Sequence, residues 1–350
     1  PGYAPYPQPG QQAPAYAPPY PVAPQQQPWT PQPGMLGAAH KPGAIPLRPL
    51  GLGDMYDGAF RIIRFNPKAT VGSAVLVAAV TMAIPVLVTA LLTFTVGAVL
   101  DESGDPGDEA LVGAAGSLGS LLLGVVLLQV GLIFVTGMVA HVTRAAAVGR
   151  RLSLGEAWAA TRGKRWRLLG LTAVINAASL GAIGLYVLMW FVVALVADGP
   201  GLVVVWGLVT VPLFGAVMCW FWVRVYYLPA PALMLEDVGV FGAIARGFRL
   251  TRRQFWRTFG IALLTVVVAS IAGNVLAVPV TIAAQIGSVA LGPEYSALAL
   301  VVSQALSTVV SSAFVAPFTS SVASLQYLDQ RMRKEAYDVE LMTQAGITAS

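Results

Sequence analysis

Residues 258–293 read TFGIALLTVVVASIAGNVLAVPVTIAAQIGSVALGP, a run that contains no Asp, Glu, Lys or Arg. A helix needs about 20 predominantly apolar residues to cross the hydrocarbon core of a bilayer. Glu294 is the only charged residue between this run and a second charge-free run at 295–328. The pair predicts two membrane-spanning helices joined by a tight turn, because unpaired backbone amides are too costly in lipid for an open chain.

The same pattern recurs along the whole chain. Charged residues make up only 11% of the 350 residues and hydrophobic residues make up 56%, whereas a soluble domain carries roughly 25% charged residues. A single Cys and two His residues exclude a disulfide scaffold and a zinc site built only from those residue types. We predict an all-α polytopic membrane protein with six transmembrane helices, at about 70–97, 114–141, 169–195, 202–223, 259–285 and 299–323.

The charges between the predicted spans indicate their orientation. All 21 Lys and Arg residues lie before the first span, in the loops 144–167 and 224–257, or after the last span. The remaining connections, 101–109, Asp198 and Glu294, contain only acidic charges. Because cytoplasmic loops carry the excess of Lys and Arg, both termini are predicted to be cytoplasmic.

The approaches to the first, third and fifth spans resemble one another. Each has an aromatic residue, an Arg four positions later and a Gly twelve positions later, which are Phe60, Arg64 and Gly72; Trp158, Arg162 and Gly170; and Phe248, Arg252 and Gly260. This spacing predicts three pseudo-repeated hairpins, each preceded by a cytoplasmic amphipathic helix that lies at the headgroups. Small residues in the second and fifth spans, among them Gly124 and Gly273, predict close helix packing.

The two ends of the chain differ in composition from the membrane domain, which we place at 50–340. Residues 1–49 hold 15 of the 25 prolines, together with Gln and Tyr, and predict a disordered cytoplasmic tail. The tail is a ligand for a Pro-recognising domain of a cytoplasmic partner, a self-associating Tyr/Gln tract or, as the favoured interpretation, a passive solvated segment. Residues 341–350 are predicted to form a short C-terminal tail.

Basic residues in the approaches and loops are candidates for binding anionic lipid headgroups or a cytoplasmic partner. They are Arg61, Arg64, Arg162, Lys164, Arg165, Arg246, Arg249, Arg252, Arg253 and Arg257. Membrane lipids, anionic on the cytoplasmic face, are therefore the expected partners, and no nucleic acid is expected.

Uncharged polar residues within the spans suggest a hydrophilic groove. The candidates are Asn176, Asn274, Ser303, Ser307 and Ser311, of which the three serines recur every four residues along one helix face. The alternative is that these side chains form hydrogen bonds or close contacts between helices.

The sequence shows no constellation of catalytic residues, and we expect no cofactor and no metal site. His141 lies at the predicted cytoplasmic end of the second span, which favours an interfacial His over a general base. Glu236 and Asp237 form a pair of carboxylates near Arg246 and Arg249. A capping and ion-pairing role is favoured over a metal or acid–base role.

Three segments resemble a known bacterial group. They are Tyr227-Leu228-Pro229-Ala230-Pro231 with its continuation to Glu236, the stretch Gly247–Arg257, and the segment Tyr327–Asp338; Arg48–Asp54 with Asp57–Arg61 fits the same group. The chain over about 47–340 is similar to the glycerophosphoryl diester phosphodiesterase membrane-domain family and its stand-alone actinobacterial relatives. The resemblance implies a six-span plasma-membrane protein without the family's catalytic barrel.

Two functional hypotheses remain open at this point. The first is a non-enzymatic scaffold or accessory subunit for cell-envelope or lipid machinery, which fits the Pro-rich tail and the basic cytoplasmic face. The second is a transporter or facilitator of a lipid or amphiphile, which would use the polar groove. An intramembrane enzyme is the least favoured hypothesis.

Overall fold

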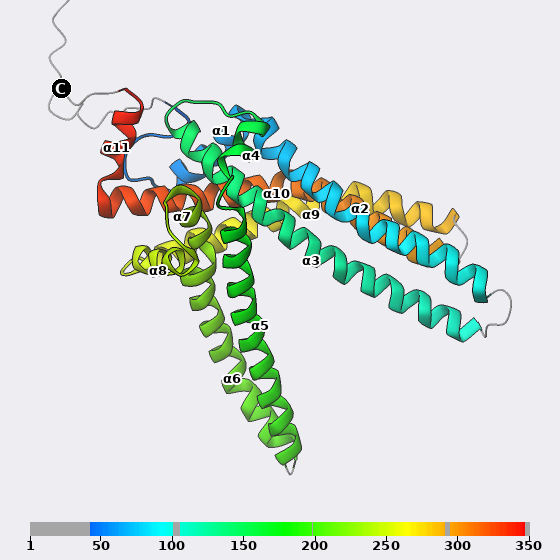
Figure 1. Cartoon of the computed structure of the whole chain (residues 1–350). Coiled ribbons are helices and arrows are strands. Elements are labelled where there is room, and N and C mark those ends of the chain that lie inside the picture. Colours follow the sequence, from blue (N-terminus) through cyan, green and yellow to red (C-terminus); the bar gives the residue numbers. More distant parts are fainter. Residues whose placement is uncertain (1–42, 101–105, 198, 291–294, 347–350) are drawn as a thin grey trace, which may run out of the picture. The chain divides into compact units, whose positions relative to one another are not determined.

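The computed structural model describes residues 43–100, 106–197, 199–290 and 295–346. Over these residues the chain is helical, with short connections and no strand (Figure 1). In chain order the elements are α1 (Leu52–Phe65), α2 (Pro67–Leu100), α3 (Pro106–Ala147), α4 (Leu154–Ala160), α5 (Arg165–Val196), α6 (Pro200–Phe221), the π-helix η2 (Trp222–Tyr227), α7 (Pro229–Leu235), α8 (Val240–Thr251), α9 (Phe255–Ala290), α10 (Ser296–Glu335) and α11 (Tyr337–Gln344). The predicted all-α fold is confirmed.

Six helical segments in the described part of the chain are long and apolar enough to cross a membrane. They are Pro67–Thr95, Leu118–Ala147, Arg165–Val196, Pro200–Leu235, Phe255–Gly287 and Leu298–Glu335. The six predicted spans are thereby confirmed, and the protein is a multi-pass membrane protein. Each observed segment is longer than predicted, mainly because the helices continue past the apolar runs on the side that carries Lys and Arg, for example at Lys68, Arg144 and Arg331.

The first and last pairs of long helices pack together. α2 lies beside α3, α9 lies beside α10, and α10 also contacts α2 and α3 (Figure 1). A Cβ atom added to Gly273 of α9 would lie 2.7 Å from Val315 Cγ2 of α10, so only Gly allows this approach. Small residues permit such packing where lipid provides no hydrophobic drive for helix association.

The middle pair, α5 and α6, is packed differently. The two helices make few close approaches to each other, and α5 touches α3, α7 and α8. In the most apolar 18-residue stretch of each middle span, no residue is buried within the protein. In the other four spans, 17% to 28% of the residues in the corresponding stretch are buried. Lipid tails are as apolar as Leu, so exposure to lipid carries no penalty for these side chains. The three hairpins are thus not equivalent in packing.

The main buried core lies where the short helices α1, α4, α7, α8 and α11 meet α3 and the second half of α10, and we call this the basal region. Tyr327 and Met55 are fully buried there. Residues 43–49 fall inside the predicted N-terminal tail, yet the structure places Ile45 and Leu47 in this core. Leu341, from the predicted C-terminal tail, is buried in α11. The rest of the predicted N-terminal tail, 1–42, lies outside the described residues.

The predicted approaches share a local architecture. A short helix precedes each of α2, α5 and α9, and these long helices begin seven residues after the aromatic residues Phe60, Trp158 and Phe248. In each case the predicted Gly is the sixth residue of the long helix. A common three-fold relation between whole hairpins stays a prediction, since the middle pair packs unlike the others.

Candidate functional site

A groove of 360 Å³ opens between α9 and α10. Most of its lining side chains carry a hydroxyl or an amide, namely Ser270, Asn274, Thr281, Gln304, Ser307, Thr308 and Ser311; Gly273, Ala277 and Val315 complete it. None of these lining residues is charged. The lining residues on α10 run from Gln304 to Val315. At a rise of 1.5 Å per residue, they lie about 9 to about 26 Å along the helix from Leu298, where the membrane span of α10 begins. The groove therefore lies within the roughly 30 Å depth of a bilayer's hydrocarbon core.

The polar groups of the groove are only partly satisfied by the helices themselves. Ser311 Oγ donates to the Ser307 carbonyl at 2.9 Å, and Thr281 Oγ1 donates to the Ala277 carbonyl at 3.1 Å. The side chains of Asn274 and Gln304 make no hydrogen bond to any described residue. Both amides are exposed, and an amide in hydrocarbon without a partner costs several kcal/mol, so water or a polar headgroup in the groove would satisfy them.

The structure separates the five residues predicted to form a groove. Asn274, Ser307 and Ser311 line it together. Ser303 lies outside the lining and donates its hydroxyl to the Leu300 carbonyl at 2.8 Å. Asn176 is exposed on α5, which belongs to the middle pair of helices.

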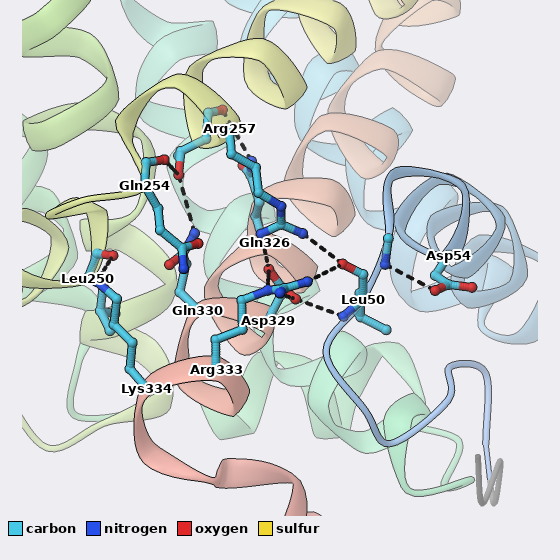
Figure 2. Close-up of polar contacts among 12 residues, drawn as sticks. Leu50, Asp54, Leu250, Gln254, Arg257, Gln326, Asp329, Gln330, Arg333 and Lys334 are labelled. Atoms are coloured by element: carbon cyan, nitrogen blue, oxygen red, sulfur yellow. Dashed lines mark hydrogen bonds and ion pairs between the residues drawn. The ribbon is translucent and has the colours of Figure 1, made fainter. Parts of the chain in front are cut away.

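A buried carboxylate organises one side of the basal region (Figure 2). Asp329 of α10 is fully buried and pairs with Arg257 of α9 at 2.5 Å and with Arg333 at 2.9 Å. It also accepts the Leu50 backbone N–H at 2.7 Å. Both guanidinium groups donate to the Leu50 carbonyl, at 2.7 and 2.9 Å. The cluster thus ties the segment before α1 to the last long helix.

Neighbouring amides extend this cluster toward the start of α9. Gln326 donates to the Thr258 carbonyl at 3.1 Å, and Gln330 donates to the Thr258 hydroxyl at 3.3 Å. The Thr258 hydroxyl itself donates to the Gln254 carbonyl at 3.0 Å. One turn further along α10, Lys334 donates to the Leu250 carbonyl at 2.7 Å and so caps the end of α8 (Figure 2).

A second ionic cluster joins α8 and α10. Glu236, at the end of α7, pairs with Arg246 at 2.9 Å and also accepts a hydrogen bond from Tyr327. Arg246 pairs in addition with Glu335 at 2.5 Å, and Arg331 lies between the two carboxylates. Burial opposes the charge on Arg246, but the hydrogen bonds to Glu236 and Glu335 outweigh it and raise the Arg246 pKa. The predicted ion-pairing role of Glu236 is confirmed, but the predicted capping role is wrong, because the N-cap of α8 is Gly239.

Lys164 donates hydrogen bonds to backbone carbonyls at the C-terminal end of α7. Its Nζ donates to the Met234 carbonyl at 3.2 Å and to the Glu236 carbonyl at 2.6 Å. Burial lowers the pKa of Lys164, although the nearby Asp237 carboxylate partly opposes that effect. Asp237 itself is exposed and pairs with Arg167 at 3.4 Å.

The ten basic residues predicted to face lipid or a partner fall into three groups. Lys164, Arg165, Arg246 and Arg257 bind other parts of the basal region. Arg61 forms an exposed i,i+4 pair with Asp57 at 2.9 Å. The remainder, Arg64, Arg162, Arg249, Arg252 and Arg253, are exposed and form no ion pair within the described chain. These five remain candidates for headgroup or partner contacts.

Several residues of these clusters were not predicted as site residues, above all Asp329 and Tyr327. The available signal was the spacing of Asp329 and Arg333, which places a carboxylate and a cation on adjacent turns of one helix. Their partners at Leu50 and Arg257 are distant in the sequence and could not be found from spacing.

Among the described residues, no group of three or more His, Cys, Asp or Glu side chains is placed so that it could hold a metal ion. Comparisons with protein-family models, with curated proteins and with solved structures find no match to this chain. The groove and the basal clusters are therefore interpreted from their own chemistry.

Proposed function

We propose that the protein is a non-enzymatic multi-pass protein of the bacterial plasma membrane, with both termini cytoplasmic, that binds an amphiphile in the α9–α10 groove. The supporting observation is the polar lining of a groove that lies at the depth of the hydrocarbon core. In this role it would act as a lipid facilitator within cell-envelope or lipid machinery.

The lining favours an uncharged polar headgroup. Hydroxyls and amides offer both donors and acceptors, and the groove has no charged side chain to compensate an anion or a cation. A glycerol, sugar or amide headgroup would satisfy Asn274 and Gln304, while its acyl chain would remain among the lipids. Exposed apolar side chains next to the lining residues on α9, such as Val275 and Val278, suit such a chain.

Asn274→Leu tests this proposal, and Asn176→Leu is the matched control. Both replace an exposed membrane-embedded amide by an isosteric apolar side chain, but only Asn274 lines the groove. Each variant would be purified from native membranes in mild detergent, and its bound lipids would be identified and counted by native mass spectrometry. We expect Asn274→Leu to lose one uncharged lipid that the wild type and the control retain. Equal lipid retention in all three proteins would contradict amphiphile binding in the groove.

A scaffold or accessory subunit is the second candidate, and the unburied α5–α6 pair favours it. Large apolar side chains such as Leu208 and Leu213 are 72% and 62% exposed there. These faces offer a membrane-embedded partner a broad surface, and the Pro-rich tail offers a cytoplasmic one. The same purification distinguishes the candidates: a stoichiometric protein that copurifies without a groove lipid favours the scaffold.

Relation to the glycerophosphoryl diester phosphodiesterase membrane-domain family is likewise a proposal, supported by the three sequence segments quoted above.

A further inference from the structure

The π-helix η2 presents an arginine to a group of three aromatic rings. The guanidinium carbon of Arg224 lies 4.7 Å from the centroid of the Phe248 ring, 5.6 Å from that of Trp220 and 5.9 Å from that of Phe255. The rings come from α6, α8 and α9, and Trp220 meets Phe248 edge to face at 5.6 Å. We call these four residues the Arg224 cage.

The local sequence explains why the cage forms at this place. Pro229 and Pro231 begin α7 and have no N–H to donate to the carbonyls of the preceding turn, which therefore widens into a π-helix. Gly247 lets α8 approach this turn, because a Cβ atom there would lie 3.0 Å from Pro229 Cγ and 3.3 Å from the Arg224 carbonyl oxygen. The approach brings Phe248 over the guanidinium.

The cage compensates the charge of Arg224 but not its hydrogen-bonding capacity. Aromatic faces attract a cation through their quadrupole, whereas the N–H groups of a guanidinium point outward in its own plane and need acceptors. Arg224 makes no ion pair and no side-chain hydrogen bond with any described residue, and its Nε is shielded from solvent without a partner. An external acceptor cannot reach the shielded Nε, but it could accept hydrogen bonds from the Nη1 and Nη2 groups, which are not buried.

The position of Arg224 indicates what that acceptor is. From Pro200, the start of the span, to Arg224 the helix rises by about 36 Å at 1.5 Å per residue. This length exceeds the roughly 30 Å of the hydrocarbon core, so Arg224 lies at headgroup level. Arg252, the C-cap of α8, follows Phe248 by four residues, is exposed and makes no ion pair with any described residue. A planar guanidinium matches the oxygens of a phosphate in a two-pronged contact.

We propose that the Arg224 cage binds the phosphate group of a membrane phospholipid, with Arg252 as a second positive charge nearby. This site is separate from the α9–α10 groove, which is lined only by uncharged residues, and it does not depend on the function proposed for that groove. The site differs from a basic surface that attracts anionic lipid without a fixed geometry. Here three aromatic rings position the Arg224 guanidinium before a lipid binds.

Arg224→Gln tests the site, and Arg162→Gln is the control because Arg162 is likewise without an ion pair among the described residues, but is exposed and has no described aromatic ring against it. Binding of short-chain phosphatidylglycerol, an uncharged lipid of equal chain length and inorganic phosphate would be titrated against each purified protein. Hydrogen bonds to a charged group contribute about 1.5–3 kcal/mol, which corresponds to about a tenfold or greater loss of affinity. We expect this loss for phosphatidylglycerol in Arg224→Gln and not in Arg162→Gln.

Two results would overturn the proposal. One is equal affinity of Arg224→Gln and the wild type for phosphatidylglycerol. The other is inorganic phosphate binding as tightly as the phospholipid, which would make this a site for a soluble anion. If Arg224→Gln does not fold, the fluorescence emission of Trp220 reports lipid binding in the wild-type protein. That emission is obtained by subtracting the spectrum of Trp220→Phe from that of the wild type. It should shift with phosphatidylglycerol and not with the uncharged lipid, and an unchanged emission would contradict the site.

Discussion

At the scale of single residues, the protein uses its few charged side chains mainly to hold its own basal region together. Asp329 is fully buried, and its two guanidinium partners are each 31% exposed. A buried carboxylate is stable only when it is paired and hydrogen-bonded, and Asp329 meets both conditions through Arg257, Arg333 and the Leu50 N–H. Arg257 is thus a structural residue, although the sequence also suggested it as a headgroup contact.

Replacing Asp329 by Asn should destabilise the protein strongly. Removing one partner of a buried ionic cluster costs about 3 kcal/mol, at the low end of the usual range because both guanidinium groups retain some solvent contact. We expect a clear drop in the apparent melting temperature in detergent and faster hydrogen exchange at Leu50. Asp57→Asn, which breaks only the exposed pair with Arg61, serves as control and should cost less than about 1 kcal/mol. Equal melting temperatures for the two variants would refute the structural role of Asp329.

At the scale of elements, the short helices position the side chains at the basal ends of the long helices. α8 touches η2 and α7 through Gly247 and the end of α10 through Lys334, so one amphipathic helix positions both the Arg224 cage and the ionic cluster of Glu236. The sequence predicts α8 as an amphipathic helix at the headgroups. It does not predict that one face of α8 is a packing surface within the protein.

Two glycines of α8 should respond in opposite ways to substitution by Ala. At Gly247 a Cβ atom would press against Pro229 and the Arg224 carbonyl oxygen, neither of which can move easily, so overpacking should cost about 1–3 kcal/mol. At Gly242 the nearest atom would be 3.5 Å away, an ordinary contact, so the better helix propensity of Ala should stabilise α8 by up to about 1 kcal/mol. Melting temperatures of the two variants measure this difference. A Gly247→Ala variant as stable as Gly242→Ala would show that α8 is free to shift.

At the scale of the whole molecule, the distribution of charge predicts the orientation in the membrane. Gly199, between α5 and α6, and Arg162, between α4 and α5, should face opposite sides of the membrane. Neither position is packed: a Cβ atom on Gly199 would meet no other atom within 4 Å, and Arg162 is exposed. Both therefore accept a Cys without disturbing the fold.

Cys labelling in intact cells measures this orientation. The exposed Cys219 is first replaced by Ser to remove background labelling. We expect Gly199→Cys to react with a membrane-impermeant thiol reagent, and Arg162→Cys to react only after the membrane is permeabilised. The reverse pattern would place the termini outside the cell and contradict the predicted topology.

The sequence alone was sufficient for the six spans and the helical fold. Hydropathy is a property of each local segment, and a charge-free run longer than about 20 residues has few alternatives to a transmembrane helix. The ion-pairing role of Glu236 was also predictable, because a cation stood ten residues further along a short amphipathic segment. These features depend on neighbours within a few turns of the chain.

Only the tertiary structure decided which residues meet. Leu50 and Asp329 are 279 residues apart, and no periodicity relates them. Asn176 and Asn274 looked equivalent in sequence, yet only Asn274 lines the groove with Ser307 and Ser311. The physical reason is that a helix apolar on every side carries no marked face, so its sequence does not specify its rotation about its own axis. That rotation is set by close contacts such as Gly273 against Val315, which exist only once distant helices have packed.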